Sequence, residues 1–345
     1  MSSLTEASQP ADVRSLLTSA QSRGLLIAVS RDPDAKATFI ITERPDLVAD
    51  SRVSRLAVKI PRTRAAGIAV EREGRMLVEL RRMPLGAIGE TIPRYVESRQ
   101  FEGRPVLVST GMPGASMSVA YHQWLHTARP QALRVDFELA GRWLAQFQSA
   151  SARGLARVTW AAEVADELRG RWDGHPRLAA ALSNLEAAQR TLGSCEAPTT
   201  AVHGDFWFGN LLVHDGQLVG VVDWESGEPE GSPLRDLARF VLSYCLYLDR
   251  HTRPGHRVAG HRGLRRVGCA PGVSYALLAN GWLPQLVRSF LGDGLTRLGL
   301  SRALWYDVAL TGIGEVAALA NDLEFGACHL ELLAGLPAHP RRYRR

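Results

Sequence analysis

Lysine is almost absent from this chain of 345 residues. Only Lys36 and Lys59 are lysines among the 41 basic residues, and all the others are arginines. Because so uneven a choice runs along the whole sequence, we interpret it as a coding bias. The net charge of +6 is then weak evidence for nucleic-acid binding. The sequence also lacks a zinc-ligand pattern and an RNA-binding aromatic signature, so we expect no nucleic-acid partner.

Long apolar runs and paired cysteine motifs are missing as well. No stretch reaches about 18 apolar residues, so we expect no helix that crosses a membrane. Residues 1–23 are polar and have no apolar core, which argues against a secretory signal. The four cysteines include no CxxC pair, so we expect free thiols in a reducing cytoplasm. They are Cys195, Cys245, Cys269 and Cys328.

What remains is an ordinary globular composition, 46% hydrophobic and 22% charged, in a chain too long for one compact core. The first part reads as strands around one helix, and the rest is mostly helical. The expected strands are 25–30, 37–42, 55–60, 92–97 and 105–109, with a helix at 65–80, a loop at 84–93 and a short helix at 13–20. The other expected helices are 133–147, 158–172, 176–192, 233–248, 274–291 and 302–333. Residues 112–114 would link two lobes, 1–111 and 112–345.

The most informative stretch is 201–225, where Asp205, Asn210 and Asp223 stand out among apolar residues. Asp215-Gly216 favours a two-residue hairpin turn with positive φ. In that register Asn210 and Asp223 project from one face, roughly 7–8 Å apart, with room for a hard cation between their oxygens. Asp205 would lie in the loop that enters this hairpin.

The spacing His203-x-Asp205-x4-Asn210 matches a kinase catalytic loop, in which the aspartate takes the hydroxyl proton and the asparagine holds Mg²⁺. With His-Gly-Asp here and Asp-Trp-Glu at 223–225, the chain resembles the aminoglycoside phosphotransferase and choline kinase-like family. The resemblance implies an α+β, two-lobed protein-kinase-like fold, with a small antiparallel-sheet N-terminal lobe and a large helical C-terminal lobe. It also implies transfer of the γ-phosphoryl group of ATP to a small-molecule hydroxyl, with Asp205 as the base and with Asn210 and Asp223 holding Mg²⁺.

Lys59 is a candidate phosphate-binding residue. It ends an apolar strand, and a sequence that otherwise uses arginine keeps a lysine here, which favours a site where a compact ammonium is required. In kinase-like folds such a lysine grips the ATP phosphates and pairs with a helix glutamate. Glu71 and Glu73 both qualify by position. We choose Glu73 because it shares the apolar stripe of the predicted helix.

The resemblance assigns three further roles. Residues Ser109, Thr110 and Gly111, where a strand runs into a turn, would form the hinge that binds adenine. Asp236, in Pro-x-x-Asp-Leu-Ala, would brace the catalytic loop by hydrogen bonds. His203 would also brace that loop, since Asp205 is better placed as the base.

The sequence departs from the kinase pattern at residues 31–36, which contain no glycine, although kinase-like folds cover the phosphates with a glycine-bearing loop. Lys36 or Ser30 would then take over part of its role. This departure bears on nucleotide affinity more than on catalysis.

The acceptor stays open, whether an aminoglycoside, an amino alcohol or a sugar-like compound. Asp307, Glu315 and Asp322 fall on one face of a predicted helix and permit a cationic acceptor, although a solvated helix face is at least as good an explanation. The basic segment 250–266, read as a surface loop, points instead to an anionic acceptor.

Three rival functions are weighed against a small-molecule kinase. Only twelve residues separate Asp223 from Asp236 and no Ala-Pro-Glu follows, which disfavours a protein kinase. A nucleotide-binding scaffold without activity is the main alternative, but every carboxylate of the motif is present. A nucleic-acid-binding module rests on arginine content alone.

Overall fold

The computed structural model describes residues 22–29, 35–43, 55–251, 257–258, 261–262 and 270–339. They belong to two compact units. The small unit comprises Met1–Gly114 and Val219–Gly227, and the large unit comprises Ala115–Leu218 and Glu228–Arg345. The helix expected at 13–20, Ser30, residues 31–34 of the glycine-free connection, much of 250–266 and the tail lie outside the described residues.

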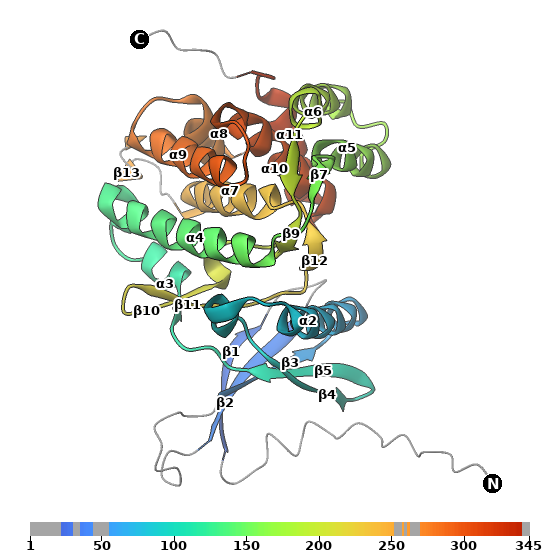
Figure 1. Cartoon of the computed structure of the whole chain (residues 1–345), viewed down its shortest axis with the longest axis vertical. Helices are drawn as coiled ribbons and strands as arrows, with labels where there is room; N and C mark the ends of the chain where they lie inside the picture. The colour runs from blue at the N-terminus through green and yellow to red at the C-terminus, as the bar shows by residue number, and fades with distance from the viewer. Residues whose placement is uncertain are drawn as a thin grey trace, which may run out of the picture. The chain divides into compact units, whose positions relative to one another are not determined.

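The small unit is built on one antiparallel sheet of five strands in the order β1-β2-β3-β5-β4 (Figure 1). The strands are β1 (Ser22–Val29), β2 (Lys36–Glu43), β3 (Arg55–Pro61), β4 (Tyr95–Phe101) and β5 (Arg104–Thr110). All five expected strands are present, but β1 begins three residues earlier and β4 three residues later than the sequence predicted. Side chains from β2, β3 and β5 form a buried core, namely Ile41, Val58, Ile60, Val106 and Val108.

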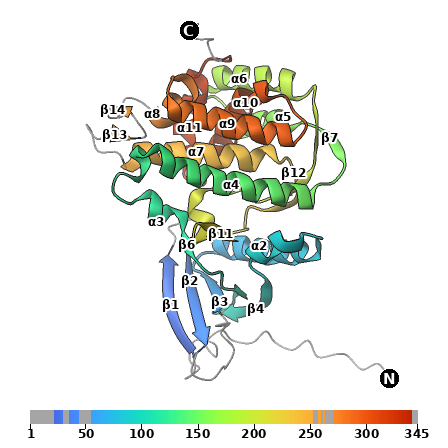
Figure 2. The ribbon, with the colours of Figure 1, turned by 60° about the vertical axis from the view of Figure 1, so that its left-hand side comes forward.

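Helix α2 (Arg64–Arg82) packs against β3 and β5 of this sheet (Figure 2). It begins at Thr63, whose hydroxyl accepts a hydrogen bond from the amide of Ala66, so an orphan donor of the first turn is satisfied. Its buried face includes Val70, Glu73, Leu77 and Leu80, at helical spacing. The loop expected after it contains a 3₁₀ helix, η2 (Gly86–Thr91).

The large unit is mainly helical, and α4, α7 and α9 pack side by side in it (Figures 1 and 2). Its helices are α3 (Met117–Tyr121), α4 (Pro130–Ser151), α5 (Trp160–Arg171), α6 (Leu178–Leu192), α7 (Leu234–His251), α8 (Pro271–Leu278), α9 (Trp282–Arg297), α10 (Trp305–Leu319) and α11 (Leu323–Gly335). Its 3₁₀ helices are η3 (His126–Ala128), η4 (Phe208–Asn210) and η5 (Arg302–Leu304). Its short strands are β6 (Ala115–Ser116), β7 (Leu155–Arg157), β8 (Glu196–Pro198), β9 (Thr200–Val202), β10 (Leu211–His214), β12 (Glu228–Gly231), β13 (Arg257–Val258) and β14 (His261–Arg262).

The hairpin turn expected at Asp215-Gly216 is present. Both residues have positive φ, 47° and 71°, as a two-residue turn of this kind requires. The turn follows β10, and β11 (Gln217–Val221) comes directly after it. Residues 219–227 belong to the small unit. The sequence-based division had placed them in the C-terminal lobe, 112–345.

Two long helices expected from the sequence are wrong. The helix expected over 274–291 divides into α8 and α9 before Gly281, whose φ of 135° is open to glycine but rare for other residues. The helix expected over 302–333 divides into η5, α10 and α11. Asp322 starts α11 by accepting a hydrogen bond from the amide of Phe325. Apolar residues recur at helical spacing on both sides of each break, so hydrophobic periodicity alone does not predict where these helices end.

Two other expectations are settled in part. Within the described ranges no helix combines the length and the apolar character that a membrane span needs. Cys195 and Cys245 are free, but Cys328 is disulfide-bonded, so the expectation of free thiols was wrong for Cys328. The absence of a CxxC pair does not exclude a bond between cysteines far apart in sequence. The cytoplasmic location stays a prediction.

The described residues of 250–266 include the end of α7 and the paired strands β13 and β14, rather than loop alone.

Candidate active site

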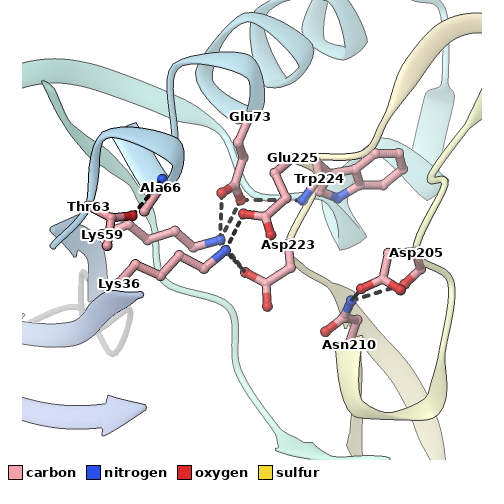
Figure 3. Close-up of polar contacts among 10 residues, drawn as sticks. All are labelled: Lys36, Lys59, Thr63, Ala66, Glu73, Asp205, Asn210, Asp223, Trp224 and Glu225. Carbon is pink, nitrogen blue, oxygen red and sulfur yellow. Dashed lines mark hydrogen bonds and ion pairs between the residues drawn. The ribbon is translucent and has the colours of Figure 1, made fainter. Parts of the chain in front are cut away.

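Lys59 of β3 forms a buried ion pair with Glu73 of α2 in the small unit (Figure 3). Its Nζ atom lies 2.6 and 2.7 Å from the two carboxylate oxygens of Glu73. Lys59 is 5% exposed and Glu73 is 1% exposed, whereas Glu71 lies on the solvent side of the helix. The structure therefore places on Lys59 the glutamate that the apolar stripe of the helix predicted.

The segment after β11 brings Asp223 to the same lysine, which donates a hydrogen bond to its carboxylate. Asp223 has a φ of 65°, a conformation that residues other than glycine rarely adopt. The next residue, Trp224, is fully buried and fixes the segment. Its ring N–H donates to the carbonyl of Val221 at 2.8 Å, and its amide donates to Glu73 at 3.4 Å. Backbone strain held in place by buried neighbours is typical of functional residues.

These carboxylates keep Lys59 charged. Burial alone lowers the pKa of Lys59, but the charges and hydrogen bonds of Asp223 and Glu73 outweigh burial and raise that pKa above its ordinary value. The small unit therefore holds an ammonium between two carboxylates that favour its charged form.

Lys36, the first residue of β2, reaches the same group of carboxylates. It donates to the carboxylate of Glu225, and its Nζ lies 3.9 Å from Asp223. Burial raises the pKa of Glu225, and the charge of Lys36 partly opposes that rise. Sequence reasoning passed over Glu225. Its signal was its place in the Asp-Trp-Glu motif, two residues after Asp223.

The loop that carries Asp205 lies in the large unit and is held by Asp236 of α7. The carboxylate of Asp236 accepts hydrogen bonds from the amides of His203 at 2.8 Å and Gly204 at 2.9 Å. Burial raises the pKa of Asp236, whereas His203 and the two amides lower it. The buried ring of His203 accepts from the amide of Asp205 at 3.2 Å. Asp236 and His203 thus brace the loop in the manner that the sequence predicted.

Aromatic packing fixes the rest of this loop. Phe206 and Phe208 are both fully buried. Phe206 stacks on Trp143 of α4 with ring centroids 5.3 Å apart, and Phe208 stacks on Tyr121 of α3 at 4.4 Å. Because these two rings anchor the loop on the helical core, the polar side chains between and beside them have a defined direction.

Asp205 is held from two sides. Arg239 of α7 donates from Nε at 2.9 Å and from Nη2 at 2.7 Å to one carboxylate oxygen, Oδ1. The amide nitrogen of Asn210 donates to the other oxygen, Oδ2, at 3.3 Å and to the main-chain oxygen of Asp205 at 3.0 Å. Sequence reasoning also missed Arg239. It lies three residues after Asp236, one turn along the same helix, which was the available signal.

A cavity of 360 Å³ in the large unit opens beside Asp205. Arg239, Asp322 and His329 add polar groups to its wall, and apolar and aromatic side chains supply most of the rest. The other lining residues are Trp207, Leu242, Ser243, Leu246, Val316 and Phe325. A cavity of this size suits a small organic molecule.

The predicted metal ligands belong to different units, Asn210 to the large one and Asp223 to the small one. Their joint action on one cation therefore stays a prediction. Each fits that role chemically. The amide nitrogen of Asn210 is occupied by Asp205, so its oxygen is the atom able to bind a cation. The Asp223 side chain is 35% exposed and offers a carboxylate.

The predicted hinge lies at the end of β5, but two of its amides are already engaged. Thr110 donates to the carbonyl of Arg94 at 2.9 Å, and Gly111 donates to the carbonyl of Arg55 at 2.6 Å. Ser109 pairs with Ala57 inside the sheet. Adenine recognition by the backbone of Ser109, Thr110 and Gly111 stays a prediction.

The three carboxylates expected on one acceptor-facing helix do not share a helix. Glu315 is buried in α10 and paired with Arg235, and it accepts from the ring N–H of Trp160. Asp307 is buried at the start of α10, where burial raises its pKa. Only Asp322, at the start of α11, lines the cavity beside Asp205. The expectation was wrong because it assumed one uninterrupted helix.

Comparisons with known proteins agree with this architecture. The model of the phosphotransferase enzyme family (APH) matches residues 47–268. A solved structure of aminoglycoside phosphotransferase APH(4)-Ia is 12% identical, with a TM-score of 0.56 over 94% of this chain and 99% of that one. A thermostable mutant of the same enzyme, in ternary complex with ADP and hygromycin B, is 14% identical, with a TM-score of 0.53 over 90% of this chain and 93% of that one. No curated protein matches the sequence significantly.

The family model covers well over half of the chain, and the solved structures share its fold. The chain belongs to the phosphotransferase enzyme family and is a small-molecule kinase with the protein-kinase-like fold.

Proposed function

We propose that this enzyme transfers the γ-phosphoryl group of ATP to a hydroxyl group of a small molecule. In this proposal Asp205 orients the acceptor hydroxyl and takes its proton. Lys59, steadied by Glu73, binds the phosphates. Asn210 and Asp223 would hold Mg²⁺, which would supply positive charge to offset the negative charge of the phosphates.

The observation that carries the proposal is the setting of Asp205. Arg239 fixes the Oδ1 atom and Asn210 contacts Oδ2, in a carboxylate that lines a cavity large enough for an acceptor. A base must be held within hydrogen-bond reach of the proton it takes, and positioning by fixed neighbours provides that. The carboxylate stays a hydrogen-bond acceptor toward the cavity while its rotation is restricted.

The small unit supplies the complementary chemistry for a polyphosphate. Lys59 is charged and buried, and Asp223 beside it is a suitable ligand for a hard cation. Support for a nucleotide comes from solved structures of the fold, which include complexes with ADP or with AMP-PNP. We extend nucleotide binding to this chain as part of the proposal.

The cavity wall favours an acceptor with little charge. Arg239 neutralises Asp205, so Asp322 is the carboxylate left to attract a cation in this wall. Trp207 and Phe325 offer flat apolar faces. A neutral or singly cationic compound with hydroxyl groups, such as an amino alcohol or a sugar-like molecule, fits this wall better than a polycation. Hygromycin B, bound in a solved relative, is therefore a comparison compound rather than the expected acceptor.

ATP turnover with Asp205→Asn tests the proposal. The panel contains aminoglycosides, amino alcohols and sugars. We expect the parent enzyme to phosphorylate one class, and the variant to lose roughly 10²–10⁴-fold in transfer while it still binds nucleotide. Asp215→Asn is the matched control, because the exposed Asp215 lies in a turn where asparagine also adopts positive φ.

Two results would contradict the proposal. Full activity of Asp205→Asn would remove Asp205 from the role of base. Nucleotide binding without transfer to any acceptor or to water, in the parent enzyme, would favour the scaffold without activity.

A further inference from the structure

Both lysines of the chain meet at one group of carboxylates in the small unit (Figure 3). Lys59 contacts Glu73 and Asp223, and Lys36 contacts Glu225. Nζ of Lys36 is also 3.9 Å from Asp223. Lys36 is 8% exposed and Lys59 is 5% exposed, so neither is a surface residue. In a chain with 41 basic residues, the two that are not arginine therefore lie together.

The strand register explains how they come together. In the antiparallel ladder of β2 and β3, Lys36 lies opposite Pro61, and Thr38 lies opposite Lys59. Pro61 and Lys59 are two residues apart on β3, so Lys36 and Lys59 project from the same face as diagonal neighbours. Diagonal neighbours of this kind have their backbones roughly 7–8 Å apart, a separation that two long side chains bridge easily.

We propose that Lys36 is a second phosphate-binding cation of this enzyme, kept in place by Glu225 until a nucleotide binds. This inference rests on the proposed function, because it concerns the same nucleotide. The chemical class that it recognises is the polyphosphate chain of a nucleoside di- or triphosphate. Lys36 would supply, by its charge, part of the attraction that a glycine-bearing loop supplies by its backbone amides.

The charge balance of the group supports this role. Three carboxylates, Glu73, Asp223 and Glu225, face two ammonium groups, so one negative charge is in excess. A divalent cation held by Asp223 would reverse the sign of this net charge, and the group would then attract phosphate. Without Lys36, the three carboxylates, Lys59 and the divalent cation together would carry no net charge. The second ammonium therefore decides whether metal binding makes the site attractive to a polyphosphate.

The identity of the residue supports the same role. A lysine ammonium is compact and can turn its three donors from a carboxylate to a phosphate, whereas a guanidinium prefers a fixed, forked partner. An ion pair needed only for stability could use arginine, as this chain does at almost every other basic position.

Binding of nucleotides with different numbers of phosphates to Lys36→Met tests the inference. The probes are AMP, ADP and AMP-PNP with Mg²⁺, and the readout is the dissociation constant from calorimetry. We expect Lys36→Met to weaken AMP-PNP binding by roughly ten- to hundred-fold and AMP binding far less, because charge-assisted hydrogen bonds to the outer phosphates are lost. Lys36→Arg should also weaken AMP-PNP binding, although it keeps the charge.

Glu225→Gln is the matched control, since it breaks the same ion pair and leaves the ammonium. It should retain AMP-PNP affinity or tighten it a few-fold, because it also removes one negative charge from the group. Thermal unfolding of each variant shows whether it is folded, and Lys36→Arg keeps the test valid where Lys36→Met does not fold.

The outcomes separate the inference from the proposed function. Equal losses in Lys36→Met and Glu225→Gln, or a loss for AMP as large as for AMP-PNP, would make the ion pair purely structural. Unchanged binding in Lys36→Met would also overturn the role of Lys36, while the proposed function stands. A parent protein that binds none of the three nucleotides would overturn both.

Discussion

At the scale of single residues, the shape of the cation at position 59 matters as much as its charge. Nζ of Lys59 lies within 2.7 Å of both oxygens of Glu73 and also donates to Asp223. A guanidinium is wider and needs forked partners, so it would displace one carboxylate or the phosphates. Lys59→Arg should therefore lose on the order of 10²-fold in turnover, because a misplacement of about 1 Å can cost that much.

Turnover of ATP in the presence of an accepted hydroxyl compound measures this effect, with circular dichroism as the check on folding. Arg62→Lys is the control, since it exchanges the same two side chains at an exposed position just after β3. Parental activity in Lys59→Arg would show that the position needs only a positive charge.

The sequence predicted the partners of these residues unevenly. Glu73 could be chosen over Glu71 because an apolar stripe marks the inward face of a helix. Arg239 and Glu225 escaped notice because charged residues on a helix or in a loop normally face solvent. What reveals them is contact with Asp205 and with Lys36, and such contacts depend on the tertiary fold.

At the scale of helices and strands, Arg235 ties three elements of the large unit together. Arg235 lies in the first turn of α7. Its guanidinium donates to Glu315 of α10 and to Glu228 of β12, each at 2.5 Å. Its side chain is 13% exposed. Arg235→Met would leave Glu315 buried without its cation, so we expect a loss of about 3–5 kcal/mol in the free energy of unfolding.

Urea denaturation measures that loss, and its pH dependence has a defined sign. Burial already raises the pKa of Glu315 above 4.5, against the opposing charge of Arg235. Removing Arg235 raises that pKa further, so the folded state holds a proton that the unfolded state releases. The deficit of Arg235→Met should therefore grow as the pH rises from the folded-state pKa of Glu315 in the parent to the higher folded-state pKa in the variant, and it should shrink in acid.

Arg169→Met is the matched control, because Arg169 pairs with Asp166 at the surface with 48% of its side chain exposed. Exposed pairs of this kind contribute about 0–1 kcal/mol, so this variant should unfold almost like the parent. If Arg235→Met lost no more unfolding free energy than Arg169→Met, the contacts of Arg235 would not be needed to hold α7, α10 and β12 together.

Strands and turns could be predicted where turn-forming residues mark their ends. The turn at Asp215-Gly216 and the strands β2, β3 and β5 follow from turn residues and apolar runs. The break between α10 and α11 did not follow, because Ala320-Asn321-Asp322 lies within a continuous apolar pattern. Its cause is the capping hydrogen bond of Asp322, which competes locally with helix continuation.

At the scale of the whole molecule, part of the positive charge of the described residues is neutralised by nearby carboxylates. Several surface arginines of the described residues are paired with carboxylates, among them Arg153 with Glu230, Arg82 with Glu79 and Arg302 with Asp293. Nucleic-acid binding needs unpaired cations along a continuous surface. We therefore expect no saturable complex with a labelled DNA or RNA oligonucleotide at roughly 0.15 M salt.

Fluorescence anisotropy over a range of salt concentrations measures this, with a non-specific single-strand-binding protein as the positive control. A complex whose affinity falls steeply as salt rises, and weakens when Arg262, Arg265 and Arg266 are neutralised, would show that the basic segment binds nucleic acid.

The boundary between the two units could not be predicted from the order of residues along the chain. The residues from Val219 to Gly227 follow the catalytic loop in sequence but belong to the small unit. Two contacts explain this, the burial of Trp224 and the fit of Gly227, where an added Cβ atom would lie 2.8 Å from Met76. Neither contact has a signature in the sequence, since both depend on partners more than a hundred residues away.

The burial of both lysines has a practical consequence for chemistry done on the folded protein. Amine-reactive labels, lysine cross-linkers and amine-coupled supports act on neutral, accessible amines, and neither lysine side chain of this chain is accessible. Lys59 is in addition held protonated by its carboxylates, which keep its pKa above the ordinary value. Acylation of a lysine should therefore be slow in the folded protein and much faster in molecules in which the small unit has opened. Apart from reaction at the terminal amine, an amine-reactive reagent would therefore mainly report the opening of the small unit.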